Sequence, residues 1–191
     1  MTRKTYQSAI EEVLRPEGFV LQVEPGRRNK TWRRDEGGSR DEVYLEHVQD
    51  LGVTISLSTV NLAAMEFLRD VAGTVGMVIP VHCRIDALIG GKSRWWKKDP
   101  NGPAEVAELI RTYALPFFEG EHDVGRQLTR FGRGREKWGG VVSRLYLAAT
   151  LHLMGETQEA CEALRNIPRT TPSSWKARVE QMRLRLGCPA D

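Results

Sequence analysis

The sequence contains few cysteines, and those it has are far apart. It has only three, an odd number, at Cys83, Cys161 and Cys188. This spacing resembles neither the disulfide framework of a small secreted protein nor the close-set ligands of a zinc site. We therefore expect reduced cysteines, no bound metal and a cytoplasmic location.

Long hydrophobic runs are also missing. No apolar stretch approaches the roughly 18 residues that a membrane-spanning helix needs, and the segment from Met1 to Gln7 lacks the apolar core of a secretory signal. Membrane partners are therefore not expected.

The sequence has only a small excess of one sign of charge. The net charge of +3 comes from 28 basic and 25 acidic residues, too small an imbalance to indicate nucleic-acid binding by itself. Basic residues do cluster in two places, however: Arg27, Arg28, Lys30, Arg33 and Arg34 in the first, and Arg94, Lys97 and Lys98 in the second.

The clearest pattern present is the segment from Val53 to Val60, in which apolar and hydroxyl residues alternate from Val53 to Ser58. Period two predicts a strand of an antiparallel sheet with one face toward the core and one toward water. Short turns separate this strand from further predicted strands at 18–23, 30–34 and 41–48, and a fifth is predicted at 77–88.

Helical patterns flank and follow these strands. They are predicted over 5–14, loosely over 61–76, from Pro103 to Pro116, over 121–131, and then over 141–154, 157–166 and 173–186, the last capped by Ser173 or Ser174. The fold predicted is α+β: an antiparallel sheet of about five strands covered on one face by helices, with a C-terminal helical hairpin. We expect an α+β sheet domain at 1–131, a Gly/Arg hinge at 132–140 and a helical subdomain at 141–191.

The order of several short segments is similar to a known family. These are Gly18-Phe19, Lys30-Thr-Trp-Arg-Arg34, Cys83-Arg-Ile85, Trp95-Trp96 and Ala114-Leu-Pro-Phe-Phe118, together with the strand from Val53. The chain resembles, over roughly residues 4–131, the bacterial "domain of unknown function 4304" family. The resemblance implies an α+β fold and a bacterial protein. It brings no established activity, so it implies no catalytic residues.

A second resemblance is confined to the C-terminal part. Tyr146-Leu-Ala-Ala149, Gly155, Ala160 and Ala163 resemble one tetratricopeptide-type helical hairpin. One such unit cannot bury its own apolar face. It is therefore expected to pack on the main domain or, alternatively, on a partner chain.

The sharpest polar set is His82, Arg84 and Asp86, which period two places on one face of the fifth predicted strand. A histidine and an aspartate there could perform acid–base chemistry, and the arginine could hold an anion. The alternative is a solvated sheet face on which Arg84 and Asp86 pair across strands.

The Trp95-Trp96 pair, with Arg94 before it, is the best candidate for a binding surface, because Trp and Arg dominate interaction hot spots. Alternatively, one tryptophan anchors the loop to the core while the other stays exposed. The basic run ending at Arg34 is either a nucleic-acid contact or a charged strand edge that prevents sheet-to-sheet pairing.

Motifs for catalysis and cofactors are not found in the sequence. There is no Gly-x-Ser-x-Gly or His-Glu-x-x-His, and Gly90-Gly-Lys-Ser93 lacks the earlier glycine of a phosphate loop. The group of Glu119, Glu121, His122 and Asp123 is interpreted as the capping start of the next helix rather than as a metal site. We therefore expect no cofactor, no metal and no catalytic residues.

These observations favour a non-enzymatic binding or interaction protein with a protein partner, in a toxin-neutralising or accessory role. Its binding residues would be Arg94, Trp95 and Trp96 with His82, Arg84 and Asp86. The alternatives are a nucleic-acid-binding protein that uses the basic clusters, and a small-molecule enzyme with His82 and Asp86 as its acid–base pair.

Overall fold

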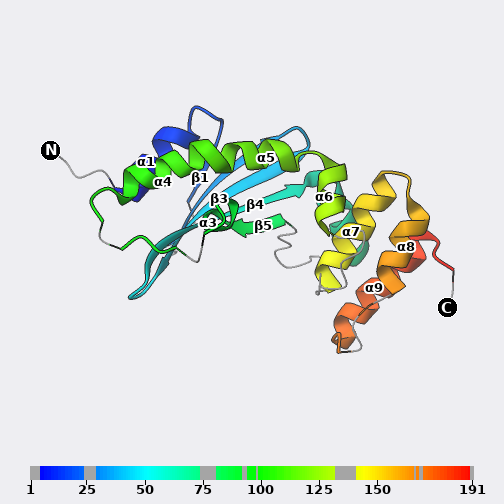
Figure 1. Cartoon of the computed structure of the whole chain (residues 1–191). Coiled ribbons are helices and arrows are strands. Elements are labelled where there is room, and N and C mark those ends of the chain that lie inside the picture. Colours follow the sequence, from blue (N-terminus) through cyan, green and yellow to red (C-terminus); the bar gives the residue numbers. More distant parts are fainter. Residues whose placement is uncertain are drawn as a thin grey trace. The chain divides into compact units, whose positions relative to one another are not determined.

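The computed structural model describes residues 5–23, 29–73, 81–91, 94–97, 99–131, 141–165, 167 and 170–189 (Figure 1). The chain forms two compact units. The first consists of Met1–Thr59 and Val81–His122, and the second of Val60–Pro80 and Asp123–Asp191. The division after His122 differs from the expected hinge at 132–140, which lies outside the described residues.

A five-stranded sheet with the order β1-β2-β3-β4-β5 is the centre of the first unit. Its strands are β1 (Val20–Gln22), β2 (Lys30–Glu36), β3 (Ser39–Val48), β4 (Gly52–Asn61) and β5 (Val81–Arg84). The β1–β2, β2–β3 and β4–β5 pairs are antiparallel, and the short turn from β3 to β4 permits only an antiparallel connection. The predicted meander and the α+β class are confirmed.

The predicted alternation along β4 is confirmed, but its polar face is not solvated. Ile55 and Leu57 are fully buried, and so are Ser56 and Ser58 on the opposite face, each no more than 2% exposed. The sequence pattern shows which side chains share a face. It does not show how much chain covers each face.

The fifth strand ends earlier than predicted, and residues 77–80 of the predicted range lie outside the described residues. β5 ends at Arg84, and the chain turns directly into the one-turn helix α3 (Ile85–Leu88). Asp86 therefore lies on a helix and not on the sheet face with His82 and Arg84. The alternation from Val81 to Ala87 is compatible with a strand over its whole length, so period two alone could not place this boundary.

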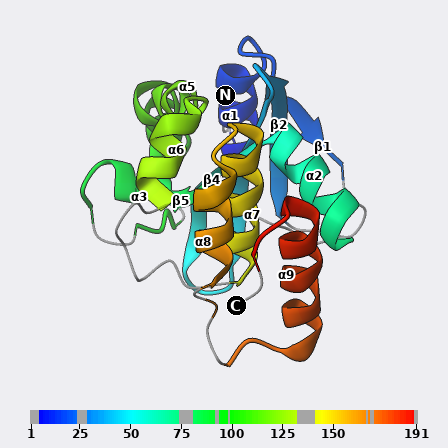
Figure 2. The same ribbon diagram turned by 90° about the vertical axis from the view of Figure 1, so that its right-hand side faces the viewer.

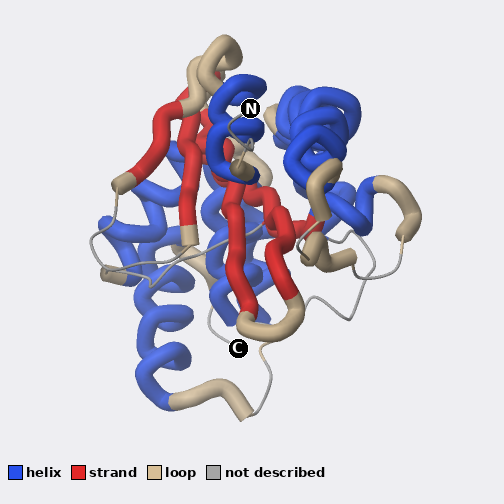
Figure 3. The backbone as a smooth tube through the Cα atoms, turned by 90° about the vertical axis from the view of Figure 1, so that its left-hand side faces the viewer, coloured by secondary structure: helices blue, strands red, loops and turns tan. Residues whose placement is uncertain are grey.

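Helices of the first unit lie along one side of the sheet (Figures 1 and 3). They are α1 (Tyr6–Leu14), α4 (Gly102–Leu109), the π-helical turn η1 (Ile110–Ala114) and α5 (Leu115–Glu121). Thr5 caps α1 with a capping box completed by Ser8. Apolar side chains of these helices, such as Ile10, Ile110 and Phe118, are fully buried with Trp32 and Val43 of the sheet.

The helix predicted to stop at Pro116 continues through it. The Leu115 N–H donates to the carbonyl of Ile110, five residues back, which is the hydrogen bond of a π-helical turn. Proline has no N–H to donate and crowds the preceding turn. The widened turn directly before Pro116 lets α5 follow η1 without a break, so the Leu115-Pro-Phe-Phe118 segment begins a helix instead of ending one.

The second unit is helical (Figure 2). Its helices are α2 (Leu62–Ala72), α6 (Val124–Phe131), α7 (Val141–Leu153), α8 (Thr157–Arg165) and α9 (Ser173–Leu186). α7 contacts α8, and both contact α9, while α2 packs on α7 and α9. The predicted hairpin thus buries its apolar face partly against α2, which directly follows β4 in the sequence.

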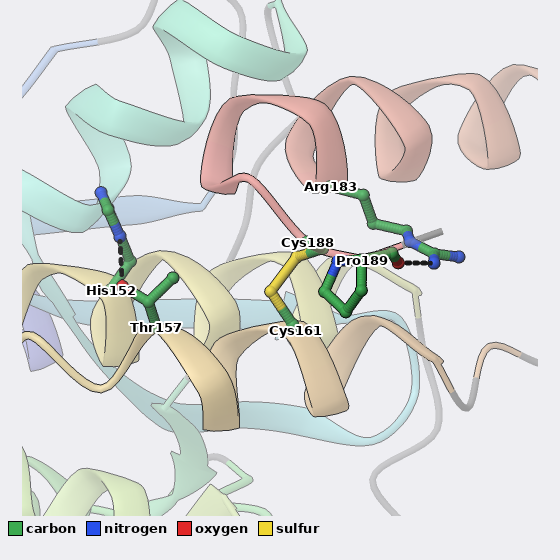
Figure 4. Close-up of a disulfide and its surroundings, with 6 residues drawn as sticks. All are labelled: His152, Thr157, Cys161, Arg183, Cys188 and Pro189. Atoms are coloured by element: carbon green, nitrogen blue, oxygen red, sulfur yellow. Dashed lines mark hydrogen bonds between the residues drawn. A yellow bond between two sulfur atoms is a disulfide. The ribbon is translucent and has the colours of Figure 1, made fainter. Parts of the chain in front are cut away.

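A disulfide in the second unit contradicts the expectation of reduced cysteines (Figure 4). Cys161 on α8 and Cys188, just after α9, are bonded, with Cα atoms 5.5 Å apart. Cys83 is not part of a disulfide. Sequence spacing could not reveal this pair, because the packing of α9 on α8 brings the two positions together.

The expected cap of α9 is also wrong. Its N-cap residue is Pro172, and neither Ser173 nor Ser174 provides a side-chain cap. Because Pro172 sits before the first helical residue, both serines fall inside the first turn. At the other end, Gly187 adopts a left-handed conformation with φ of 69° and closes the helix.

Candidate functional site

The first unit contains a cavity of about 1030 Å³ at one end of the sheet. It is bounded by α1, the start of β2, the turn between β3 and β4, and the segment after Arg94. Its described lining residues are Tyr6, Lys30, His47, Val48, Gln49, Asp50, Gly52, Val53, Trp96 and Lys97. We call it the Trp96 cavity, and its volume is at the upper end of the range typical of small-molecule sites.

Trp96 is a fixed wall of this cavity. Its backbone forms an antiparallel bridge with Val53, with N···O distances of 2.9 and 3.0 Å. Its indole N–H donates to Glu105 of α4 at 2.9 Å, and its side chain is buried. Because backbone and ring are each held by hydrogen bonds, the indole offers a rigid apolar surface.

Gly52 allows this close approach. It has a φ of 111°, and a Cβ at this position would collide with the carbonyl of Trp96. Glycine alone combines this backbone conformation with so narrow a gap.

Tyr6 forms another wall. Its hydroxyl donates to the backbone carbonyl of Lys97 at 3.1 Å. Burial, followed by the negative charges of Asp99 and Glu105, raises the pKa of Tyr6 above its ordinary value. The phenol therefore stays protonated, and keeps this hydrogen bond, throughout the neutral range.

Charged groups stand among these apolar walls. Lys30 is half-buried at the start of β2, and Lys97 and Asp50 are exposed. Asp50 has a φ of 64° in the turn that leads into β4, a conformation that aspartate tolerates better than most residues. Among the described residues, no ion pair joins Asp50 to either lysine.

The structure separates the predicted acid–base pair. His82 is exposed on β5 and lies opposite Ser58 of β4. Asp86 is buried on α3, where it pairs with Arg84 at 3.0 Å and accepts a hydrogen bond from the backbone N–H of Arg94. No hydrogen bond or ion pair between described residues joins His82 to Asp86.

Arg84 instead serves the Trp-bearing loop. Its guanidinium stacks on the ring of Trp95 at 4.6 Å from the centroid and donates to the Arg94 carbonyl at 2.6 Å. Trp95 is half-buried, whereas Trp96 is buried. Four of the predicted binding residues, Arg84, Asp86, Arg94 and Trp95, therefore form one internally paired group in which Asp86 and Arg84 shape the loop.

Three arginines of the basic clusters are paired with carboxylates. Arg33 pairs with Glu42 at 2.7 Å, and Arg34 pairs with Asp41 and with Glu36, each at 2.9 Å. Arg94 pairs with Glu105. Arg27, Arg28 and Lys98 lie outside the described residues. β2 is also an inner strand, so the interpretation of this run as a charged sheet edge is wrong.

A buried carboxylate on the helix-covered face was missed by the sequence analysis. Asp41 is fully buried and accepts hydrogen bonds from Thr59 at 2.7 Å and Arg34 at 2.9 Å. Its carboxylate also lies 2.9 Å from Nε2 of His122, at the end of α5. The sequence contains one indication of this position. Asp41 and the apolar Val43 are two residues apart on the same predicted strand, so their side chains lie on the same face of the sheet.

This cluster connects α5 to the sheet, and it replaces part of the predicted capping group. The capping interpretation holds for Asp123, whose side chain accepts from the backbone N–H groups of Gly125 and Arg126 at the start of α6. His122 instead binds Asp41. The sequence alone could not distinguish these neighbours.

The opposite face of the sheet also carries an internal polar network. Glu42 accepts a hydrogen bond from the Tyr44 hydroxyl and pairs with Arg33, and the Tyr44 oxygen lies 3.2 Å from that of Ser58. Burial, and then the hydrogen bond to Glu42, raise the pKa of Tyr44. These groups satisfy one another, which fits a structural role.

Metal-binding groups of three or more His, Cys, Asp or Glu residues are absent from the part of the chain that the structure describes. Within the same residues, no helix has the length and apolar character needed to cross a membrane. No protein-family profile, curated protein or solved structure matches this chain. The two resemblances noted from the sequence therefore stay predictions.

Proposed function

We propose that this chain is a non-enzymatic binding protein that holds a small ligand in the Trp96 cavity. The observation that carries the proposal is a cavity of about 1030 Å³ whose aromatic walls are already fixed. Tyr6 and Trp96 have their polar atoms bound to Lys97 and Glu105, so they present apolar surface without a further cost of ordering.

The arrangement of polar groups favours binding over catalysis. General acid–base chemistry needs a base within hydrogen-bond reach of the group it serves. Asp86 is engaged with Arg84 and with a backbone N–H, and His82 stands apart from it on β5. Asp41 and His122 do lie together, but the described residues that line the Trp96 cavity do not include them.

The nucleic-acid alternative loses part of its support. Three of its seven predicted contacts, Arg33, Arg34 and Arg94, are paired with carboxylates. Guanidinium groups engaged in this way must give up these partners before they bind phosphate, which removes much of the gain.

The proposal is tested with anilinonaphthalene, a neutral probe whose fluorescence rises in apolar surroundings. Wild-type protein should enhance the probe's fluorescence saturably. Val48→Trp should abolish this enhancement, because Val48 lines the cavity and is 40% exposed, so that a larger side chain can fill the space without disturbing the core.

Val20→Trp is the matched control. Val20 is 64% exposed on β1 and does not line the cavity, so this variant should bind the probe as the wild type does. Equal binding by Val48→Trp and wild type would refute the cavity as the site. If the wild type binds neither this probe nor its sulfonated form, the proposed function itself is wrong.

A further inference from the structure

The two lysines of the Trp96 cavity differ from the arginines of the first unit. Every arginine described in that unit has a carboxylate partner within 4.0 Å: Arg15, Arg33, Arg34, Arg40, Arg84, Arg94 and Arg111. Lys30 and Lys97 are the lysines described there, and neither makes an ion pair with a described residue. Both line the cavity.

Lys30 is partly removed from water and makes no ion pair with a described residue. It lies opposite Leu45 in the β2–β3 register, on the face of the sheet that carries Trp32 and Val43. Its side chain is only half exposed. An ammonium group that loses water is destabilised unless an anion or hydrogen-bond acceptors replace that water.

The rest of the lining shows what kind of anion would fit. The walls are aromatic and aliphatic, from Tyr6, Trp96, Val48 and Val53. Among the described lining residues, one carboxylate, that of Asp50, faces two lysines, so their charges sum to a positive value. A fully polar anion such as phosphate would leave the apolar walls uncovered.

We infer that the ligand of the Trp96 cavity is a small organic anion with a flat apolar body, whose acidic group is held by Lys30 and Lys97. The body would lie against the aromatic walls, and the acidic group would give Lys30 a partner that the described residues do not provide. This inference rests on the proposed binding function and specifies its ligand class.

The test compares anilinonaphthalene with anilinonaphthalene sulfonate, which share one aromatic framework and differ in the acidic group. Wild-type protein should bind the sulfonate at least as tightly as the neutral probe. Lys30→Met and Lys97→Met, which keep an apolar stem, should each weaken sulfonate binding about tenfold, because each removes a charged hydrogen bond. Binding of the neutral probe should change by less than about twofold.

Lys176→Met is the matched control. Lys176 is exposed on α9 in the second unit, so this change removes the same charge without touching the cavity and should leave both affinities unchanged. Val48→Trp should abolish binding of both probes, which shows that the sulfonate occupies the cavity. Where a methionine variant does not fold, Lys30→Gln or Lys97→Gln takes its place.

The outcomes separate the two claims. Binding of both probes with equal loss in the lysine variants would mean that the lysines shape the cavity without selecting an anion, and would overturn this inference while the proposed function stands. If the wild type binds the neutral probe but not the sulfonate, this inference is likewise overturned and the proposed function stands. If neither probe binds the wild type, the proposed function fails first.

Discussion

The hydroxyl of Tyr6 packs against Gly102, the first residue of α4, so closely that a side chain at Gly102 would collide with the phenol. A Cβ at this position would lie only 2.9 Å from the ring carbon that carries the hydroxyl. The same hydroxyl donates to the Lys97 carbonyl. One glycine in α4 thus determines where a wall of the Trp96 cavity stands.

Replacing Gly102 with alanine should therefore destabilise the protein. Displacing Tyr6 breaks its hydrogen bond to Lys97, and overpacking of this kind costs roughly 1–3 kcal/mol, which exceeds the 0.5–1 kcal/mol or so that alanine gains over glycine in a helix. Urea denaturation followed by tryptophan fluorescence measures the difference.

Tyr6→Phe provides the control for this prediction. Combined with Gly102→Ala it removes the colliding oxygen, so the double variant should lose less stability than the sum of the two single changes. Strict additivity of the two stability losses would show that the phenol and a side chain at position 102 do not compete for the same space.

Asp41→Asn should be among the most damaging isosteric changes in the first unit. The buried carboxylate has Arg34, Thr59 and His122 around it, and removal of its charge leaves Arg34 without its buried partner. A loss of about 3 kcal/mol in unfolding free energy is expected. Asp35→Asn is the matched control, because the Asp35–Arg40 pair is largely exposed and such pairs contribute about 0–1 kcal/mol. Similar losses in the two variants would contradict the buried network.

Tyr146→Phe should destabilise the second unit by roughly 1–3 kcal/mol. The Tyr146 hydroxyl accepts the Asn61 backbone N–H at 2.7 Å, and Asn61 caps α2. The change leaves that N–H without its acceptor. Tyr113→Phe, at an exposed position, should have little effect. Hydrogen exchange at the start of α2 measures the loss, and unchanged exchange there would refute the link.

The raised pKa of Tyr146 also predicts that the stability of the protein decreases at high pH. Burial raises its pKa to about 12, whereas an unfolded tyrosine titrates near pH 10. Since the folded pKa is the higher one, its stabilising contribution is complete below about pH 10 and is lost as the pH rises toward 12. Stability measured across this range should fall less steeply in Tyr146→Phe than in the wild type. Parallel curves would contradict the assignment.

Reduction of the Cys161–Cys188 disulfide should destabilise the second unit. The bond closes a loop with a sequence separation of 27, and loss of such a constraint typically costs about 2–4 kcal/mol. Thiol titration of denatured, non-reduced protein should find one thiol, from Cys83, and the double change Cys161→Ser with Cys188→Ser should match the stability of reduced protein. Cys83→Ser is the control, and reductant should lower the stability of this variant as it does that of the wild type. Detection of three thiols without reduction would show that the bond does not form.

Much of the fold could be predicted because local patterns carry it. The alternation in β4 and the helical patterns of α1 and α2 each depend on residues within a few positions of one another. The failures occurred where one pattern fits two structures. The alternation from Val81 suits both a strand and a strand followed by a helical turn, and Pro116 suits both a helix end and a π-helical turn.

The candidate site was predicted only in part. The sequence directed attention to Trp96, since a tryptophan in a charged loop is a common binding feature. It could not associate Trp96 with Tyr6 or Lys30, because these residues lie 90 and 66 positions before Trp96 in the sequence. It also grouped His82 with Asp86, which the structure separates.

The amino-acid order by itself determined most of the element types and limits and the antiparallel meander, because backbone preference and side-chain periodicity act over short distances. Only the tertiary structure decided that Asp41 meets His122, that Cys161 meets Cys188 and that the Trp96 cavity exists. Contacts of this kind depend on how whole elements pack, and packing is determined by the shape and volume of side chains remote in the sequence.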